Sequence, residues 1–182
     1  MGEITEVRLS GYGGQGVVLA GLLLGAAGVL DGRFVAGSNS YGAQARGSGC
    51  KAEVVLSAFP IDFPHITKAD ILVAMSQGAY DLYYRDMKEG SGLILYDSGL
   101  VKPREGLEVK QIGLPVTESA VRKLASKQVA NIVFLGALTE ITQIVSLPSL
   151  RKAIREHVSE RFQSLNLKAL SAGMALGRKS HG

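Results

Sequence analysis

A chain of 182 residues is long enough for one domain with a substantial core and too short for two, so we expect a single domain over residues 1–182. With 46% apolar and 20% charged residues, the composition is that of a folded protein and excludes a disordered one. The net charge of +4 is modest, and the basic residues gather mainly in the last third of the chain. That distribution is typical of a solvated helical face, with an anionic ligand or partner as the alternative, and argues against a nucleic-acid partner.

The first residues, the longest apolar stretch and the cysteine content bear on location. The chain opens with an acidic segment where a secretory signal would be basic, so we expect a cytoplasmic protein. The apolar stretch 17–30 is shorter than the roughly 18 residues of a membrane span and predicts a buried helix, with no membrane partner. Cys50 is the only cysteine, so this chain alone cannot form a disulfide, a thiolate zinc site or an iron–sulfur cluster. Any electron-transfer centre must lie on another chain.

A glycine-rich stretch, residues 11–16, lies where a short strand at 7–10 should pass into the apolar helix at 17–30. Its spacing fits the G-x-G-x-x-G pattern, in which glycines let a phosphate approach the backbone and the helix start offers free N–H groups. A phosphate-bearing ligand is therefore the first hypothesis, and the candidate residues are Gly13, Gly14, Gln15 and Gly16.

The strand that follows argues against a dinucleotide. Residues 34–36 form a second short strand, which completes a β-α-β unit of suitable length. A dinucleotide fold places Asp or Glu about 20 residues after the glycine motif to hold the ribose. Here Gly37, Ser38 and Asn39 follow the strand and Asp31 precedes it, so NAD or FAD binding is disfavoured.

Residues 40–50 form a polar, glycine-rich segment without periodicity, which predicts a loop. Its length and its single Arg46 favour a binding loop, because long ordered loops in compact domains are more often functional than neutral. The alternative is a flexible connection with Arg46 in solvent. A strand at 52–57 follows the loop.

Strands and helices alternate through the middle of the chain. We expect strands at 70–75, 92–97 and 108–112, and a helix that starts after Ser76 and runs to about Met87. Ser76 is either an N-cap or a ligand contact, since such strand-to-helix crossings line the carboxyl edge of an open sheet. The alternation predicts an α/β fold: a Rossmann-like open, mostly parallel sheet with helices on both faces.

The last third of the chain is helical in pattern. Thr117 is the expected N-cap of a helix that runs to about Ser126, and Pro148 suits the first turn of another helix. Residues 129–138 are apolar all round apart from Asn131, so this helix is buried or covered by a partner. Asn131 makes either a cap or core hydrogen bond, or a ligand contact.

Catalytic patterns are missing. The three histidines are scattered without a carboxylate or thiol at a spacing that suggests a triad or a metal site, and they are interpreted as surface residues. The glycine motif lacks the Gly-Lys-Ser/Thr ending of a P-loop. The sequence therefore predicts a binding site without a nucleophile, which suits a subunit that binds a phosphorylated cosubstrate while covalent chemistry proceeds on another polypeptide.

Four stretches together resemble the gamma subunit of the 2-oxoacid:ferredoxin oxidoreductases, a family that oxidises pyruvate, 2-oxoglutarate or branched-chain 2-oxoacids to acyl-CoA. They are residues 8–16, residues 40–47, residues 70–77, and residues 131–138 together with 146–147. The Gly-Gly-Gln-Gly sequence combined with Ser-Tyr-Gly is more specific than the bare glycine pattern. Within the family the 2-oxoglutarate branch is most similar, with pyruvate, ketoisovalerate and indolepyruvate enzymes as alternatives.

The resemblance implies coenzyme A as a cosubstrate at or near this chain. The glycine stretch would present N–H groups to an anionic part of CoA, and Arg46 would contact phosphate, which an arginine can hold bidentately. The loop departs from the family in Ala43 and Gln44, where Pro and an acid are usual, and in Ser48, where a second glycine is usual. The implied binding residues are Gly13, Gly14, Gln15, Gly16, Ser40, Tyr41, Arg46, Gly47, Ser48 and Asn131.

The same resemblance implies that this subunit carries no catalytic or metal-binding residue. It places thiamine diphosphate, its magnesium and the iron–sulfur clusters on partner subunits, namely alpha and beta chains and a delta or ferredoxin-like chain, with ferredoxin reached through the complex. The alternative function is a stand-alone nucleotide-binding or regulatory module with a Rossmann-like fold, in which the same glycines serve another ligand.

Overall fold

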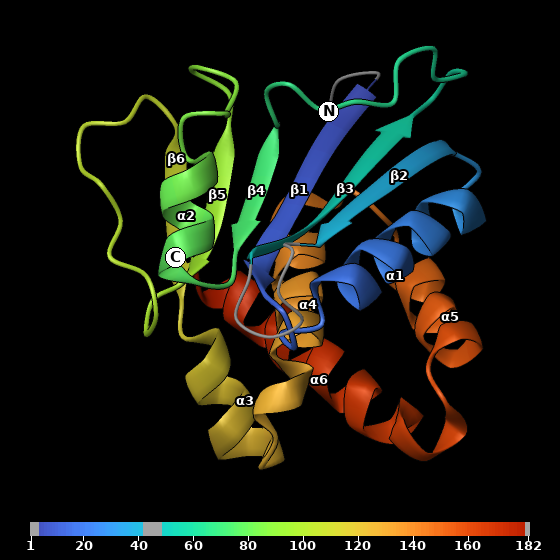
Figure 1. Ribbon diagram of the computed structural model, residues 1–182. Coiled ribbons are helices and arrows are strands. Elements are labelled where there is room, and N and C mark those ends of the chain that lie inside the picture. Colours follow the sequence, from blue (N-terminus) through green and yellow to red (C-terminus); the bar gives the residue numbers. More distant parts are fainter. Residues whose placement is uncertain (1–3, 42–48, 181–182) are drawn as a thin grey trace.

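The computed structural model describes residues 4–41 and 49–180. One six-stranded sheet runs through the centre of the molecule, in the order β2-β3-β1-β4-β5-β6 (Figure 1). Neighbouring strands β1, β4, β5 and β6 are parallel, which confirms the expected mostly parallel sheet. The strands are β1 (Ile4–Tyr12), β2 (Phe34–Tyr41), β3 (Gly49–Ser57), β4 (Ile71–Ala74), β5 (Leu93–Asp97) and β6 (Lys110–Leu114).

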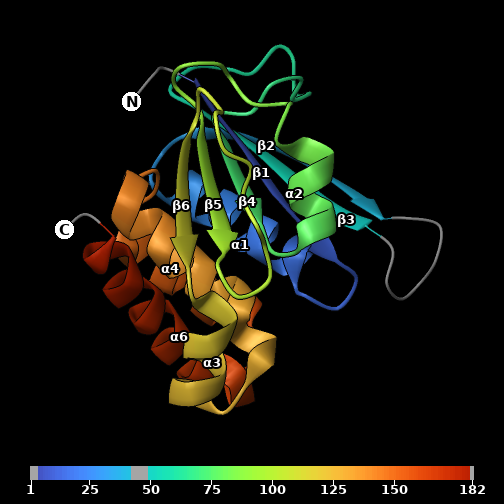
Figure 2. The same ribbon diagram turned by 90° about the vertical axis from the view of Figure 1, so that its left-hand side faces the viewer.

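Helices cover both faces of the sheet, as expected, but unequally. In Figure 2 the short helix α2 lies on one side of the sheet, and α4 and α6 lie on the other. α1 shares the second side, because its buried residues pack with those of α4 in one core cluster. The helices are α1 (Val17–Leu30), α2 (Gln77–Tyr83), α3 (Val116–Leu124), the 3-10 turn η1 (Lys127–Val129), α4 (Ala130–Thr142), α5 (Leu147–His157) and α6 (Glu160–Lys179).

Strand β1 separates the two layers because its side chains alternate between the faces. Val7 and Leu9 are fully buried in the larger core, under α1 and α4. Arg8 points to the other face, where its Nε donates to Glu53 on β3. The strand is therefore buried on both sides, and the end of β1 is held firmly in place.

One prediction about the sheet is wrong. The strand predicted at 34–36 extends to Tyr41 and the strand predicted at 52–57 begins at Gly49, so both ends of the predicted loop 40–50 are strand. β2 and β3 pair antiparallel from Phe34 opposite Ser57 to Tyr41 opposite Cys50. β3 also pairs antiparallel with β1, so it lies between the two strands of the expected β-α-β unit. The strand predicted from local pattern stops at residue 36 because Gly37, Ser38 and Asn39 have low strand propensity, which pairing with β3 overrides. Residues 42–48, which connect the two strands in sequence, lie outside the described residues.

Two N-cap residues were predicted and one is confirmed. Ser76 is the N-cap of α2, and its Oγ accepts a hydrogen bond from the Ala79 N–H at 3.2 Å. Thr117 is not the N-cap of α3, which begins at Val116 after Pro115. The N–H of Thr117 instead donates to Oδ2 of Asp97, a residue distant in sequence, at 2.8 Å. A cap supplied by another strand cannot be found from local sequence.

The apolar helix α4 is buried within this chain rather than covered by a partner. It packs lengthwise against α6, and both helices carry glycine at the contact (Figure 2). A Cβ on Gly136 would fall on the Leu170 carbonyl oxygen, and one on Gly173 would fall on the Val133 carbonyl oxygen. The two backbones therefore approach more closely than any larger residue would allow.

Candidate functional site

The glycine stretch forms a tight turn between β1 and α1 at the carboxyl edge of the sheet (Figure 1). Gly14 and Gly16 have φ angles of 96° and 72°, in the left-handed region that favours glycine. A Cβ on Gly14 would meet no atom of the described residues within 4 Å, so they leave the outer side of the turn open. The strand order runs outward from β1 in both directions, to β3 and to β4. The turn thus lies at a switch point, where open α/β sheets bind ligands.

The side chain of Gln15 braces this turn. Its Oε1 accepts from the Tyr12 N–H at 2.6 Å, and its Nε2 donates to the Met75 carbonyl oxygen at 2.8 Å. It thereby ties the end of β1 to the end of β4. Gly11 leaves room for this amide, because a Cβ there would fall on Gln15 Oε1. The Gln in Gly-Gly-Gln-Gly is a positioning residue, and backbone groups are left to face a ligand.

Asn131 supports the turn from the other side. It lies in the first turn of α4, is 2% exposed, and its Nδ2 donates to the Gly16 carbonyl oxygen at 3.0 Å. Gly16 is matched to this contact, since a Cβ on it would fall on Asn131 Nδ2. Of the two alternatives for Asn131, the structure provides the core hydrogen bond.

The β2–β3 hairpin rises at the same edge of the sheet as the glycine turn. Register pairs Gly11 with Cys50, and Cys50 in turn with Tyr41. Ser40 is an exposed residue near the end of β2, and Tyr41 is its last residue. The remaining candidates of the hairpin, Arg46, Gly47 and Ser48, lie outside the described residues.

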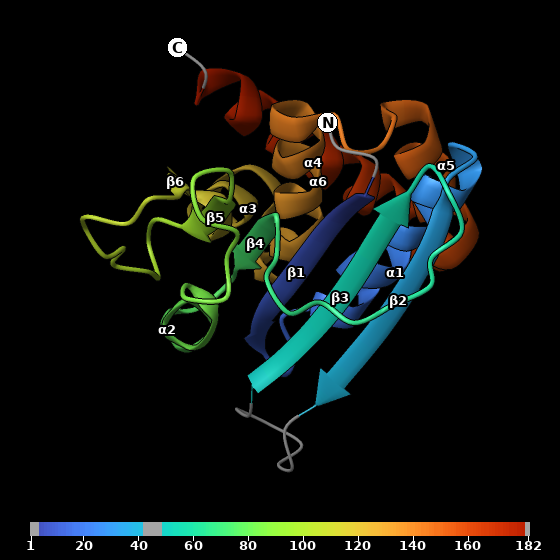
Figure 3. The same ribbon diagram turned by 90° about the horizontal axis from the view of Figure 1, so that it is seen from above.

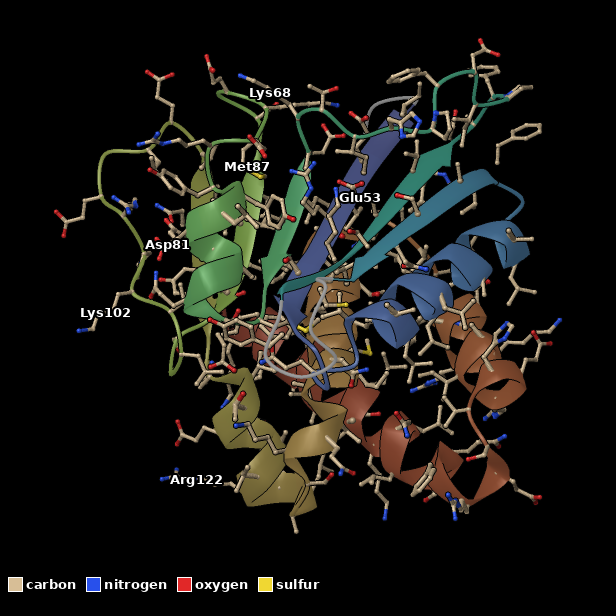
Figure 4. The ribbon with its side chains drawn as sticks, viewed as in Figure 1. Glu53, Lys68, Asp81, Met87, Lys102 and Arg122 are labelled. Atoms are coloured by element: carbon tan, nitrogen blue, oxygen red, sulfur yellow. The ribbon has the colours of Figure 1, made fainter. Side chains whose placement is uncertain are left out.

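Two hollows flank the turn. The first, of about 280 Å³, lies on the α3 and α4 side, and the second, of about 420 Å³, lies on the α2 side beside the hairpin base. The first is lined by Gly13, Gly14, Gln15, Met75, Asp97, Thr117, Lys127, Gln128, Ala130 and Phe134. The second is lined by Ser10, Gly11, Tyr12, Gly49, Gly78, Ala79, Asp81 and Leu82, and Figure 4 shows Asp81 on the outer side of α2.

The first hollow contains a cation that sequence reasoning missed. Lys127 is exposed on η1, directly before α4, and makes no ion pair with any residue that the structure describes. Met75, Ala130 and Phe134 give the hollow an apolar floor. An ammonium group beside an open glycine turn is suited to a phosphate attached to a partly apolar molecule. A basic residue two positions before the apolar stretch 129–138 was the available signal.

Asp97 is the second residue that the sequence analysis missed. It ends β5, is 1% exposed, and accepts hydrogen bonds from Gly99 N at 3.0 Å and Thr117 N at 2.8 Å. Both carboxylate oxygens therefore accept hydrogen bonds from backbone N–H groups, and Asp97 positions α3 along the wall of the first hollow. An acid at the end of the predicted strand 92–97 was the only signal.

We expect Asp97→Ala to lower the free energy of unfolding by about 1–3 kcal/mol, because it leaves two backbone N–H groups without their charged acceptor. Chemical denaturation measures the change. Ser98→Ala is the matched control, since Ser98 is an exposed neighbour and its loss should change the free energy by less than about 0.5 kcal/mol. Equal effects of the two substitutions would contradict the capping role.

Other chemistry is limited in the described part of the chain. Residues 4–41 and 49–180 contain no group of three or more His, Cys, Asp or Glu placed to hold a metal ion. The single thiol, that of Cys50, is buried, and burial raises its pKa. None of the helices within the described ranges is long and apolar enough to cross a membrane.

Comparison with known proteins decides the family. A family model described as pyruvate ferredoxin/flavodoxin oxidoreductase matches residues 6–176. The chain belongs to this family. The 2-oxoglutarate synthase subunit KorC of Methanocaldococcus jannaschii is 46% identical over 177 residues, with 96% of this chain and 94% of that subunit covered. This likeness confirms the family expected from the sequence.

Two solved structures share the fold. The gamma subunit of a keto/oxoacid ferredoxin oxidoreductase from Geobacter sulfurreducens has a TM-score of 0.88 and 36% identity, and the match covers 98% of this chain and 99% of that one. The 2-oxoglutarate:ferredoxin oxidoreductase of Magnetococcus marinus, solved with 2-oxoglutarate, coenzyme A and succinyl-CoA bound, has a TM-score of 0.89 and 24% identity. That match covers 98% of this chain but 32% of the longer one. The protein is a gamma-type subunit of a 2-oxoacid:ferredoxin oxidoreductase.

Proposed function

We propose that this subunit contributes coenzyme A binding and complex assembly to the oxidative decarboxylation of a 2-oxoacid to its acyl-CoA. The observation that carries the proposal is the open, left-handed glycine turn with a hollow on each side. 2-Oxoglutarate is the favoured substrate, and likeness to KorC subunits supports it. The Magnetococcus marinus enzyme of the same fold, solved with coenzyme A bound, supports the choice of cosubstrate.

In this proposal the backbone of Gly13, Gly14 and Gly16 faces a phosphate of CoA, while Gln15 and Asn131 hold the turn in shape. Lys127 on η1 contacts a phosphate, and Arg46, which lies outside the described residues, is the second phosphate contact that we propose. The apolar floor under Phe134 suits the uncharged part of the molecule. CoA supplies the thiol that accepts the acyl group, and the residues of this chain bind and orient it.

The first hollow, about 280 Å³, is slightly smaller than the roughly 300–1,000 Å³ common for ligand pockets. A molecule as long as CoA would extend beyond it, so we infer that another chain completes the site. Thiamine diphosphate, magnesium and iron–sulfur clusters belong to the partner alpha, beta and ferredoxin-like subunits in this proposal, and ferredoxin receives the electrons through the complex. The compartment proposed is the cytoplasm.

We expect Lys127→Ala and Arg46→Ala each to weaken CoA binding by roughly 10- to 150-fold, because each removes a charged hydrogen bond of about 1.5–3 kcal/mol. Isothermal titration of the assembled complex with CoA measures the change. Lys123→Ala, which removes an exposed lysine on α3 outside the hollow, is the matched control and should bind as the parent does. Parent-like affinity in both test variants would exclude the turn as the CoA site. Turnover of the complex with each 2-oxoacid tests the favoured substrate.

A further inference from the structure

A hollow of about 560 Å³ lies at the edge of the sheet opposite the glycine turn. β2 runs in the same direction as β1, because both pair antiparallel with β3, so Arg33 directly before β2 lies at the edge where β1 begins. Figure 3, which looks down on this edge, shows the start of β2 beside α1 and α5. The end of α4 lines the hollow with Thr139, Glu140 and Gln143. Its volume is in the range of roughly 300–1,000 Å³ that small-molecule pockets have.

Two polar groups that line this hollow have few partners. Arg33 is half-buried, and the one hydrogen bond that its side chain makes with a described residue is from Nη1 to the Ile144 carbonyl oxygen at 3.1 Å. Asp31 acts on it electrostatically but without a hydrogen bond. Thr139 is 5% exposed, and its Oγ1 has no hydrogen-bond partner among the described residues. Because such groups are normally satisfied, a ligand with acceptor oxygens fits this hollow.

Two carboxylates also line the hollow, and only one of them has an oxygen to spare. Asp31 accepts from the N–H and Oγ of Ser146 at 2.6 Å each, and from Ser149 Oγ at 2.5 Å. Burial opposes its ionisation, but these bonds outweigh burial and hold the pKa of Asp31 below its ordinary value of 3.8. Glu140 has a side chain that is 22% exposed, and its Oε2 lies 3.3 Å from Arg178 Nη1. Its Oε1 has no partner among the described residues.

The remaining lining restricts the class of ligand. A carboxylate is the group that pairs best with the guanidinium of Arg33, and an ammonium group is the donor that suits the spare oxygen of Glu140. Inorganic phosphate would pair with Arg33 but would also face the negative charges of Asp31 and Glu140, which disfavours it. Leu147 and Met174 add an apolar surface to the same hollow.

We propose that this hollow binds a free α-amino acid with an apolar side chain. The carboxylate of the ligand pairs with Arg33, its ammonium group pairs with Glu140, and its side chain contacts Leu147 and Met174. The site lies at the opposite edge of the sheet from the glycine turn, so it goes beyond the proposed CoA-binding function and does not rest on it. An α-amino acid carries an amino group where a 2-oxoacid carries its oxo group, so the ligand is a chemical relative of the family's substrates.

A series of matched ligands tests the proposal on the parent chain. Isothermal titration with L-leucine, L-valine and L-methionine should give a Kd of about 1 mM or tighter for at least one of them. The 2-oxoacid and the amine that correspond to this amino acid lack the ammonium group and the carboxylate, respectively. For leucine they are 4-methyl-2-oxopentanoate and 3-methylbutylamine, and each should bind at least about tenfold more weakly. No binding of the three amino acids, or equal binding of the 2-oxoacid or of inorganic phosphate, would overturn the proposal.

Substitution assigns the two ends of the ligand. Arg33→Ala and Glu140→Gln should each weaken binding of the amino acid by about tenfold or more, because each removes a charged partner. Glu140→Gln should also abolish the preference for the amino acid over its 2-oxoacid, which a general loosening of the fold would not do. Arg151→Ala and Glu156→Gln, at exposed residues of α5 outside the hollow, are the matched controls and should bind as the parent does.

Two results of this series would contradict the assigned site. They are parent-like binding by both test variants, and an unchanged preference for the amino acid in Glu140→Gln. CoA titration of the complex that carries Arg33→Ala should match the parent, because Arg33 lies at the far edge of the sheet. The amino-acid site and the CoA site can therefore fail independently.

Discussion

Gly173→Ala should lower the free energy of unfolding by on the order of 4 kcal/mol or more, a larger loss than most single substitutions cause. The added methyl group would fall on the carbonyl oxygen of Val133 and lie 3.0 Å from the Ala137 nitrogen, both in the backbone of the buried helix α4. Backbone atoms of a helix cannot move aside as a flexible side chain can. The two helices would have to separate, which opens the larger hydrophobic core along their length.

Gly25→Ala is the matched control for this prediction, because it adds the same methyl group to another helix. At Gly25 the nearest atom to the new Cβ is Val35 Cγ1 at 3.4 Å, an ordinary contact. The substitution should raise the free energy of unfolding by about 0.5–1 kcal/mol, since alanine is the better helix former. Urea denaturation of the two variants measures both changes. A decrease in the free energy of unfolding below about 1 kcal/mol for Gly173→Ala would show that this glycine contact does not fix the distance between α4 and α6.

The parts of the fold that were predicted correctly are those encoded by local patterns. The strand-to-helix transitions at Gly16 and Ser76 follow from glycine and capping chemistry within a few residues, and the buried helix at 130–142 follows from its uniform apolar composition. The insertion of β3 between β1 and β2 does not follow from local patterns. It depends on which strand edges pair after the hairpin closes, and the weak strand propensity of Gly37 to Asn39 concealed that hairpin.

The candidate site likewise has one part that the sequence predicts and another that it does not. The glycine turn can be predicted from the sequence, because the left-handed φ angles at positions 14 and 16 favour glycine. The hydrogen bonds that support the turn cannot be predicted from the sequence, because Gln15 bonds to Met75 and Asn131 bonds to Gly16, and each pair is distant in sequence. Lys127 enters the site only because the fold places η1 and the turn around the same hollow. The sequence can single out residues such as Gln15 and Asn131, but it does not show which distant groups they bond to, whereas it does show the backbone conformation of the turn.

Glu53→Gln should lower the free energy of unfolding by about 3–5 kcal/mol, because it leaves a buried arginine without its main partner. Glu53 lies among the central strands in Figure 4, with its side chain 7% exposed. Its Oε1 accepts from Arg8 Nε at 2.7 Å and lies 3.1 Å from Lys51 Nζ. Arg8 is 3% exposed, and its Nη1 has no hydrogen-bond partner, only the Asp86 carboxylate at 3.5 Å. The neutral amide would therefore leave the Arg8 charge largely uncompensated.

The same pair should make stability depend on pH in a defined direction. Burial opposes ionisation of Glu53, but the hydrogen bonds and charges of Arg8 and Lys51 outweigh it and hold the pKa of this carboxyl below its ordinary value of 4.5. The folded chain therefore gives up the Glu53 proton more readily than the unfolded chain does. Its contribution to stability is complete above pH 4.5 and is lost as pH falls through the lower pKa of the folded state.

Denaturation of the parent and of Glu53→Gln between neutral pH and the acid limit of folding measures this dependence. The parent should lose more stability than the variant over the acid range, so the difference between them should shrink as pH falls. Glu118→Gln is the matched control, because Glu118 pairs with Arg122 at 2.9 Å on the solvent side of α3, where Figure 4 shows Arg122 pointing away from the sheet. That exposed pair should contribute less than about 1 kcal/mol. Equal losses in the two variants would mean that burial adds nothing to the Arg8–Glu53 pair, and that the β1–β3 junction beside the glycine turn is held by apolar packing alone.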